Sequence, residues 1–195
     1  MAMILAAGLS AQTHAQSPIS FGLKGGFNIA NLTGEDFDAD ARFGFSGGAV
    51  VDISLPAVPF GIESGVVYTQ KGAEASEGGF SANVDLDYIE VPVLAKFQLG
   101  PSGPITPHLV VGPYLGFNIN AESESSLSGT VDISDDINST EIGGALGVGI
   151  DFNLGVTKLN ARAQYGYGFT DVFKDAGEGS GGKNAALSVT AGIWF

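Results

Sequence analysis

The carboxyl-terminal stretch NAALSVTAGIWF (184–195) alternates in character with a period of two. Positions 185, 187, 189, 191, 193 and 195 are apolar, whereas the positions between them are small or polar apart from Trp194. Because successive side chains point to opposite faces of a strand, the stretch is predicted to be a β-strand with one wholly apolar face. It also ends directly on Phe195, which indicates a terminus that is held or recognised rather than frayed in water.

The same alternation recurs along the rest of the chain. Seven further strands are predicted at about 19–31, 42–54, 58–71, 86–99, 105–119, 140–153 and 156–171. The connections are short at 55–59, 100–104 and 153–156, and long at 32–41, 72–85, 120–139 and 172–183. This layout predicts an all-β fold, an eight-stranded antiparallel up-and-down transmembrane β-barrel, with the tight turns and both termini in the periplasm.

Charged residues of the predicted strands fall on the polar face. A narrow closed lumen needs balanced charges, because an unpaired buried charge costs several kcal/mol. We therefore expect an ion-pair network inside the barrel and lipid against the apolar face. The expected network consists of Lys24, Arg42, Asp52, Glu63, Lys71, Glu90, Lys96, Glu141, Asp151 and Arg162.

The remaining acidic residues lie in the long loops and account for the formal net charge of −13. So acidic a surface argues against nucleic acid as a partner. Asp36, Asp38 and Asp40 form a weak candidate for divalent metal, because Ala41 stands where a calcium loop requires Gly. No cofactor is predicted, since the loop GEGSGGKN (177–184) lacks the following helix of a phosphate-binding loop.

Residues 1–15 combine a short apolar run with small residues before Gln16 and are predicted to be a signal peptide. Its basic region is missing, which indicates either a truncated start or a misassigned initiator. The barrel domain is expected to span 19–195. No window of the chain reaches the roughly 20 apolar residues of a helical membrane span, so any crossing must be made by strands.

His108 is predicted to face the lumen near the periplasmic end of the barrel. A lipid-modifying barrel enzyme would need a nucleophile and an orienting acid beside it, and none can be assigned. The run GGALGVG (143–149) is interpreted as packing room inside a tight barrel rather than as a cofactor motif. No catalytic residue is predicted, and the protein is expected not to be an enzyme.

Several segments, in order, carry a family resemblance: FGLKGGFNIANLTG, FGFSGGAVVDI, GIESGVVYTQKGA, LDYIEVPVLAKFQLG, GPYLGFNI and AQYGYGFTDVF. The chain resembles the PorT-like outer-membrane β-barrel family, also called the outer membrane protein β-barrel domain or porin family. The resemblance implies an eight-stranded barrel in the bacterial outer membrane and little about activity. A barrel of eight strands is filled by its own side chains, so a wide pore is not expected.

These observations favour a monomeric scaffold in contact with outer-membrane lipid, with acidic extracellular loops and an unidentified envelope or extracellular protein partner. Ile193, Trp194 and Phe195 are predicted to form the signal read by the barrel-assembly machinery. Three alternatives remain open: a narrow small-solute or ion channel, a lipid-modifying enzyme that depends on His108, and a soluble ligand-binding barrel.

Overall fold

The computed structural model describes residues 18–34, 40–55, 58–77, 80–101, 103–125, 129–174 and 181–195. Every regular element in these ranges is a β-strand. The strands are β1 (Ile19–Thr33), β2 (Asp40–Ser54), β3 (Phe60–Glu77), β4 (Phe80–Gln98), β5 (Ile105–Ser125), β6 (Gly129–Asp132), β7 (Thr140–Asn153), β8 (Lys158–Gly168) and β9 (Lys183–Trp194). Within the described ranges, no helix is long and apolar enough to cross a membrane.

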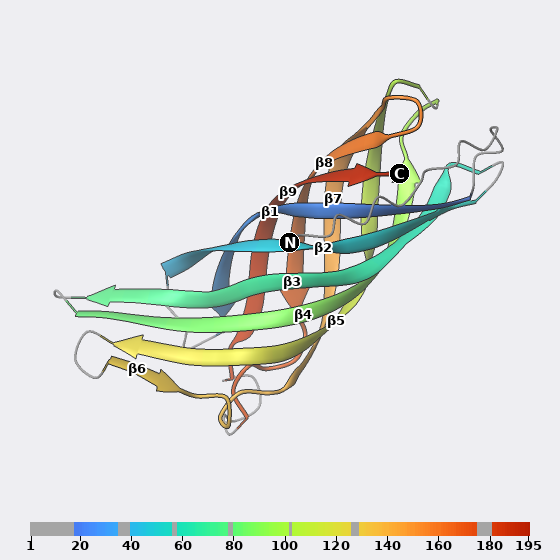
Figure 1. Cartoon of the computed structure of the whole chain (residues 1–195). Coiled ribbons are helices and arrows are strands. Elements are labelled where there is room, and N and C mark those ends of the chain that lie inside the picture. Colours follow the sequence, from blue (N-terminus) through green and yellow to red (C-terminus); the bar gives the residue numbers. More distant parts are fainter. Residues whose placement is uncertain are drawn as a thin grey trace, which may run out of the picture.

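The strands form one antiparallel sheet that closes on itself (Figure 1). The sheet order is β4-β3-β2-β1-β9-β8-β7-β5-β6, and pairing of β4 with β5 joins its two sides. The first and last barrel strands, β1 and β9, pair from Gly22↔Trp194 to Thr33↔Lys183. Short β6 pairs only with β5, outside the ring, so eight strands make the wall, as predicted.

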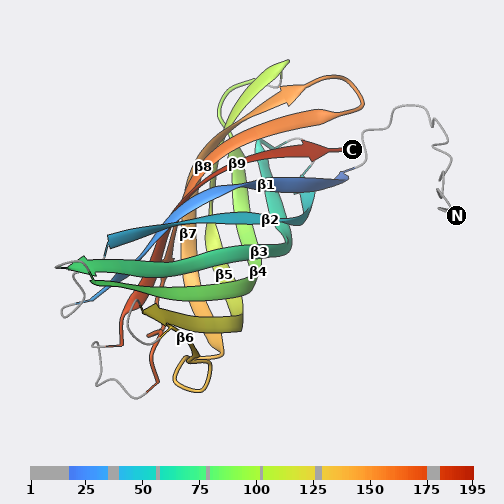
Figure 2. The same ribbon diagram turned by 60° about the vertical axis from the view of Figure 1, so that its left-hand side comes forward.

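The three short connections lie at one end of the barrel, here called the turn end, together with the carboxyl terminus and the start of β1 (Figure 2). The connections β1–β2, β3–β4, β5–β7 and β8–β9 lie at the other, the loop end. Chain reversal at each antiparallel pairing enforces this separation, because consecutive wall strands run in opposite directions.

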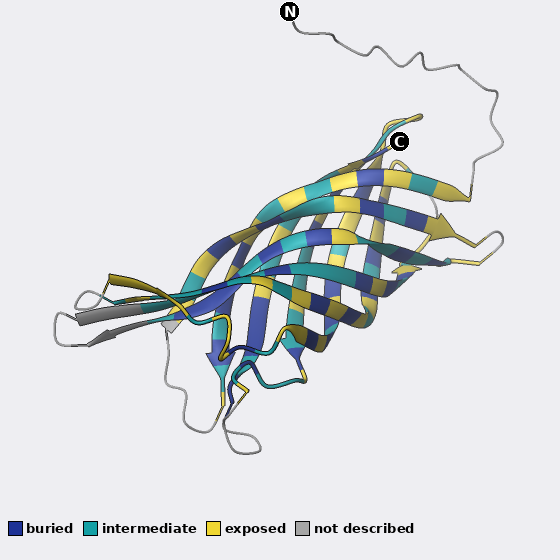
Figure 3. Ribbon diagram, turned by 60° about the horizontal axis from the view of Figure 1, so that its bottom comes forward, coloured by how far each residue is buried: buried dark blue, intermediate teal, exposed yellow. Residues whose placement is uncertain are grey.

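The apolar face points outward around the whole barrel, as the alternation predicts (Figure 3). Leu23, Phe27 and Val189 are 55%, 61% and 60% exposed, whereas inward Lys96 and Arg162 are 3% exposed. An exterior this rich in aliphatic and aromatic side chains suits hydrocarbon, and in water it would promote aggregation. A soluble ligand-binding barrel, which turns its apolar face inward, is therefore contradicted.

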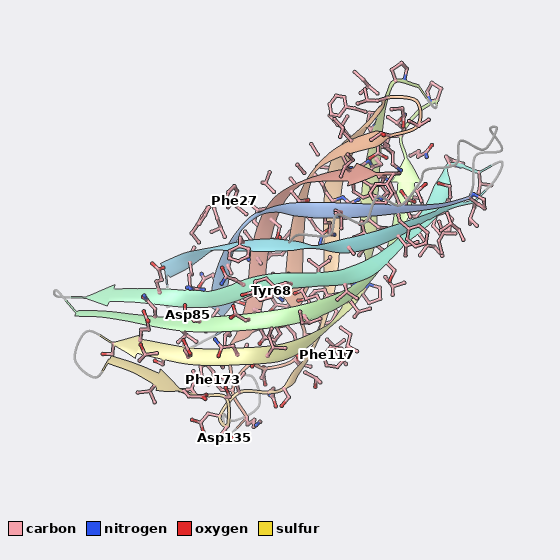
Figure 4. All side chains as sticks on the ribbon, in the orientation of Figure 1. Phe27, Tyr68, Asp85, Phe117, Asp135 and Phe173 are labelled. Atoms are coloured by element: carbon pink, nitrogen blue, oxygen red, sulfur yellow. The ribbon has the colours of Figure 1, made fainter. Side chains whose placement is uncertain are left out.

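Aromatic side chains pair with one another on this outer face, some near the turn end and others toward the loop end (Figure 4). Phe60 and Phe97 pack in a tilted arrangement near the turn end, with ring centroids 5.2 Å apart. Phe27 and Phe43 lie 5.3 Å apart toward the loop end. Rings at both interfaces fix the height of a barrel in a bilayer.

Three strands are longer than predicted. β3 continues to Glu77 and β4 begins at Phe80, so much of the loop expected at 72–85 is a hairpin that extends the wall beyond the predicted strand ends (Figure 1). β5 likewise continues to Ser125 and pairs there with β6. The prediction was wrong here because main-chain hydrogen bonds maintain strand pairing without an apolar face, and an extension of this kind leaves no apolar period in the sequence.

A β-bulge in β5 changes which of its residues face the lumen. Asp87 pairs with Asn120 and Tyr88 with Asn118, so Ile119 is an extra residue with no partner in β4. Beyond it the inward phase switches, and Ala121 is completely buried. One inserted residue reverses the faces of a strand because side chains alternate with a period of exactly two.

Candidate functional site: the charged lumen

Near the turn end, Lys96 lies between two carboxylates of opposite walls. Its Nζ atom is 2.8 Å from Asp52 Oδ2 on β2 and 2.8 Å from Asp151 Oδ2 on β7. Lys158, on β8, approaches the same Asp52 oxygen at 3.1 Å. Since each cation has a carboxylate partner at hydrogen-bond distance, the desolvation of these buried charges is compensated.

His108 belongs to this turn-end cluster and is 1% exposed. Its Nδ1 atom lies 3.7 Å from Asp151 Oδ1, and Asn160 donates a 2.7 Å hydrogen bond to that same oxygen. A Cβ atom at Gly149 would lie 2.6 Å from His108 Nε2, so the glycine provides room for the ring. On the other side of the ring, Asn160 Nδ2 lies 3.4 Å from His108 Nε2.

At mid-height, a bidentate ion pair crosses the lumen. Arg162 on β8 donates two hydrogen bonds of 2.6 Å to the two oxygens of Glu63 on β3. The two side chains are 1% and 0% exposed. Lys24 on β1 adds a longer contact, 3.6 Å from Glu63 Oε1. Planar guanidinium and carboxylate groups match in this geometry, which makes the pair both strong and rigid.

Toward the loop end, Lys71 of β3 bridges two glutamates. Its Nζ atom lies 2.7 Å from Glu90 Oε1 and 2.6 Å from Glu141 Oε1. Tyr114 donates a 2.5 Å hydrogen bond to Glu141, and Asn184 donates another to its second oxygen. A Cβ atom at Gly143 would lie 2.2 Å from the Tyr114 ring, so this glycine of the 143–149 run does provide packing room.

Arg42 occupies a different place from the other nine expected network residues. It forms an ion pair with Asp85 at the loop-end rim, where the two side chains are 17% and 20% exposed. Asp85 was placed in a loop by the sequence, because the extension of β4 was not recognised. Lys158, 21% exposed, is a lumen cation absent from the expected network, and its inward phase in the predicted 156–171 strand is the signal that could have found it.

With Lys158 included, the ion pairs of the described lumen below the rim contain equal numbers of cations and anions. They are Lys24, Lys71, Lys96, Lys158 and Arg162 against Asp52, Glu63, Glu90, Glu141 and Asp151. With such a balance, the Coulomb attraction between the paired charges offsets the desolvation cost of the individual ions.

An apolar cap closes the loop end of the lumen. Ile137 and Val172, from the β5–β7 and β8–β9 connections, are 1% and 2% exposed and pack against inward Leu32, Leu86 and Tyr88. The two connections are joined through an isolated β-bridge between Ile137 and Phe173. Figure 4 labels Phe173 and Asp135 at this end of the barrel. Sequence analysis had placed both segments in outer loops, and their contact with the lumen depends on the closed ring.

Further hydrogen bonds hold the cap. The Asn138 N–H donates to Val172 O at 2.8 Å, and Lys174 Nζ donates to Asp135 O at 2.8 Å. Outside the membrane, Ser134 donates a main-chain hydrogen bond to Asp132 Oδ1 at 2.9 Å, and its hydrogen bonds lower the pKa of the Asp132 carboxyl. The segment 132–138 is therefore a structured turn that covers the barrel.

Trp194 fills the turn end. It is 1% exposed and packs in one cluster with Val50 of β2 and Val67 of β3. Lys96 and Lys158 lie 5.8 Å and 5.6 Å from its ring centroid, within cation–π range. The space exists because Gly192 has no side chain: a Cβ atom there would lie 2.3 Å from the indole.

The structure thus separates the three residues of the expected assembly signal. Trp194 lies inside the barrel, whereas Ile193 and Phe195 are 42% and 67% exposed on the outside. Other expected features lie outside the described residues: the signal peptide, Asp36, Asp38, the side chain of Asp40 and most of the 177–184 loop. No cluster able to hold a metal ion occurs among the described residues.

A family model described as "Outer membrane protein beta-barrel domain" matches residues 10–174. The chain belongs to this family. It is therefore an integral protein of the bacterial outer membrane, in agreement with its outward apolar face. A search of curated protein sequences gave no significant match.

Solved structures of outer-membrane barrels share the fold of this family member. Neisserial surface protein A is 16% identical with a TM-score of 0.54, and the match covers 90% of this chain and 97% of that one. Ail, the attachment invasion locus protein of Yersinia pestis, is 15% identical with a TM-score of 0.50, covering 90% and 98%. At these identities the likeness shows the barrel architecture.

Proposed function

We propose that this protein is a non-enzymatic, non-conducting scaffold in the outer membrane that presents acidic hairpins to the cell exterior. The observation that carries the proposal is the filled lumen. It is crossed by the Arg162–Glu63 pair, closed at the loop end by Ile137 and Val172, and closed at the turn end by Trp194. Because paired and packed side chains fill the lumen, the outer surface is the part of the molecule that is left to interact with other molecules.

The projecting strands β4, β5 and β6 supply that surface. Asp85 pairs in register with Glu122, and Glu122 with Asp132, so three carboxylates form a row across the strands. Arg42 compensates the charge of Asp85, but Glu122 and Asp132 oppose each other as like charges, which destabilises a sheet and is better explained by a role in recognition or solubility. The partner we propose is an extracellular or envelope protein, still unidentified.

Further features of the proposal come from the sequence. The protein works as a monomer, belongs to the PorT-like branch of the family, and has both termini in the periplasm. Its carboxyl-terminal strand binds the barrel-assembly machinery before the barrel closes. Burial of Trp194 supports the last point, because the indole is accessible to another protein only while β9 is unpaired.

Orientation can be tested by single-cysteine labelling, because the native chain contains no Cys. Thr130→Cys in β6 is expected to react with a membrane-impermeant maleimide on intact cells. The matched control is Val156→Cys at the turn end, where the native side chain is 81% exposed. It should react only after the outer membrane is permeabilised. The reverse pattern would place the hairpins in the periplasm and overturn the proposed topology.

The filled lumen predicts no steady conductance. Purified protein reconstituted in a planar bilayer is expected to give no channel steps under conditions in which a general-diffusion porin conducts. Reproducible steps from the native protein, absent from a mock preparation, would instead support the narrow-channel alternative. The lipid-modifying alternative has no comparable support, since the imidazole of His108 lies inside the lumen, away from lipid.

A further inference from the structure

Two cations share one carboxylate in the middle of the lumen. Arg162 occupies both oxygens of Glu63 at 2.6 Å, which leaves Lys24 with a single contact of 3.6 Å to Glu63 Oε1. The Lys24 side chain is only 9% exposed. Its contact with Glu63 is the one ion pair that Lys24 forms within the described ranges. A buried ammonium needs more than one long contact to offset its lost hydration.

The complementary excess of negative charge lies toward the loop end. There Lys71 is shared by Glu90 and Glu141, at 2.7 and 2.6 Å. The lumen is neutral as a whole, but its charge is unevenly distributed along the axis. The trio of Lys24, Arg162 and Glu63 carries one surplus positive charge.

A cavity of about 40 Å³ lies between these two groups and is lined by Lys24 on one side and by Lys71 and Glu90 on the other. This volume exceeds the roughly 10–15 Å³ that one water requires. Its remaining polar lining is Ser46, Thr69, Gln164, Ser188 and Thr190.

Donors predominate beside Lys24. Within the described residues, the side chains of Ser46, Ser188 and Thr190 form no hydrogen bond with the protein, although all three line the cavity. Thr69, by contrast, donates to Glu90 at 3.3 Å on the opposite side. The Lys24 ammonium and these hydroxyls therefore offer several donors on the side of the cavity away from Glu90, a setting that suits a ligand that accepts hydrogen bonds.

We propose that this cavity is a binding site for a small monovalent inorganic anion, with chloride the physiological candidate. The anion would lie against the Lys24 ammonium and accept hydrogen bonds from the hydroxyls of β2 and β9. It would neutralise the surplus charge of the Lys24, Arg162 and Glu63 trio. A metal cation is disfavoured there, because Lys71 already occupies the space between the two glutamates.

The inference is independent of the proposed scaffold role, since a filled barrel of any function could hold such an ion. It is tested with full-length protein in detergent, crystallised in sodium bromide in place of chloride. We expect an anomalous bromide peak within contact distance of Lys24 Nζ in the native protein. The peak should be lost in Lys24→Met and retained in the control Lys158→Met, which removes a lumen cation of the turn-end cluster.

Chloride-35 line broadening measures the same site in solution. Native protein should broaden the chloride signal, and bromide should reverse the effect by competition. If Lys24→Met does not fold, as judged by heat-modifiable mobility, the double variant Ser188→Ala with Thr190→Val decides the question. It keeps every lumen charge and is expected to weaken chloride binding about tenfold, the factor of one charge-assisted hydrogen bond.

Three results would overturn the proposal. The first is a native cavity that contains only water or an adventitious ion whose peak persists in Lys24→Met. The second is a chloride signal that the native protein does not broaden. The third is unchanged chloride affinity in the double hydroxyl variant.

Discussion

Glu63→Ala is expected to lower the free energy of unfolding by about 3–5 kcal/mol, the cost of breaking a fully buried ion pair. The substitution leaves the Arg162 guanidinium without its two 2.6 Å acceptors and removes the carboxylate contact of Lys24. Both cations would then remain inside a closed wall without the carboxylate that compensates their lost hydration. The measurement is urea unfolding of barrel folded in detergent, followed by heat-modifiable mobility on gels.

Asp85→Ala is the matched control for this prediction. It removes the carboxylate of another arginine pair, but the Asp85 and Arg42 side chains are 20% and 17% exposed at the rim. Solvent screens such a pair, so a cost of about 0–1 kcal/mol is expected. Equal losses of unfolding free energy for Glu63→Ala and Asp85→Ala would show that the buried lumen pair does not stabilise the barrel more than the pair at the rim.

Trp194→Ala is expected to destabilise the barrel by about 3–5 kcal/mol, as for other large aromatic side chains removed from a core. The indole packs in one cluster with Val50 of β2 and Val67 of β3 and fills the space left by Gly22 and Gly192. Because the lumen wall is a hydrogen-bonded ring, it cannot collapse to fill the cavity. Unfolding in urea, with the same gel assay, measures the loss.

Ile193→Ala tests whether the effect belongs to the lumen or to the end of β9. Ile193 is the neighbouring residue but faces outward and is 42% exposed. Its truncation leaves no internal cavity, so the loss should be clearly smaller than for Trp194→Ala. Since Trp194 is the only tryptophan of the chain, native fluorescence also reports directly on its burial. Comparable losses for the two variants would contradict a specific role for the indole inside the lumen.

Much of the fold could be predicted because a membrane barrel has one strong sequence signal. Its wall strands alternate between lipid and lumen, so the period of two found in 184–195 locates both the strand and its lipid face. The same phase placed nine of the ten expected network residues among the buried ion pairs of the lumen, with Arg42 at the rim. Alternation sufficed there because each strand contributes its inward side chains independently.

The partners of those side chains could not be predicted. Glu63 and Arg162 meet across the lumen from β3 and β8, and which acid faces which base depends on strand tilt and register around the closed ring. The extension of β3 and β4 beyond the predicted strand ends was missed, because main-chain pairing there leaves no apolar period. The Ile119 bulge was missed because one inserted residue is invisible until two strands are aligned.

The carboxyl-terminal strand shows most clearly which features depend on the local sequence and which depend on the tertiary structure. Its alternating residues determined by themselves that Leu187, Val189 and Ile193 face outward, since that depends only on local backbone geometry. The role of Trp194 was decided by the tertiary structure. An indole in the inward phase becomes a lumen plug only when β9 closes against β1 and brings Val50, Val67 and Lys96 around it. Those contacts join residues far apart in the chain, so no local pattern encodes them, and closure of the ring creates them.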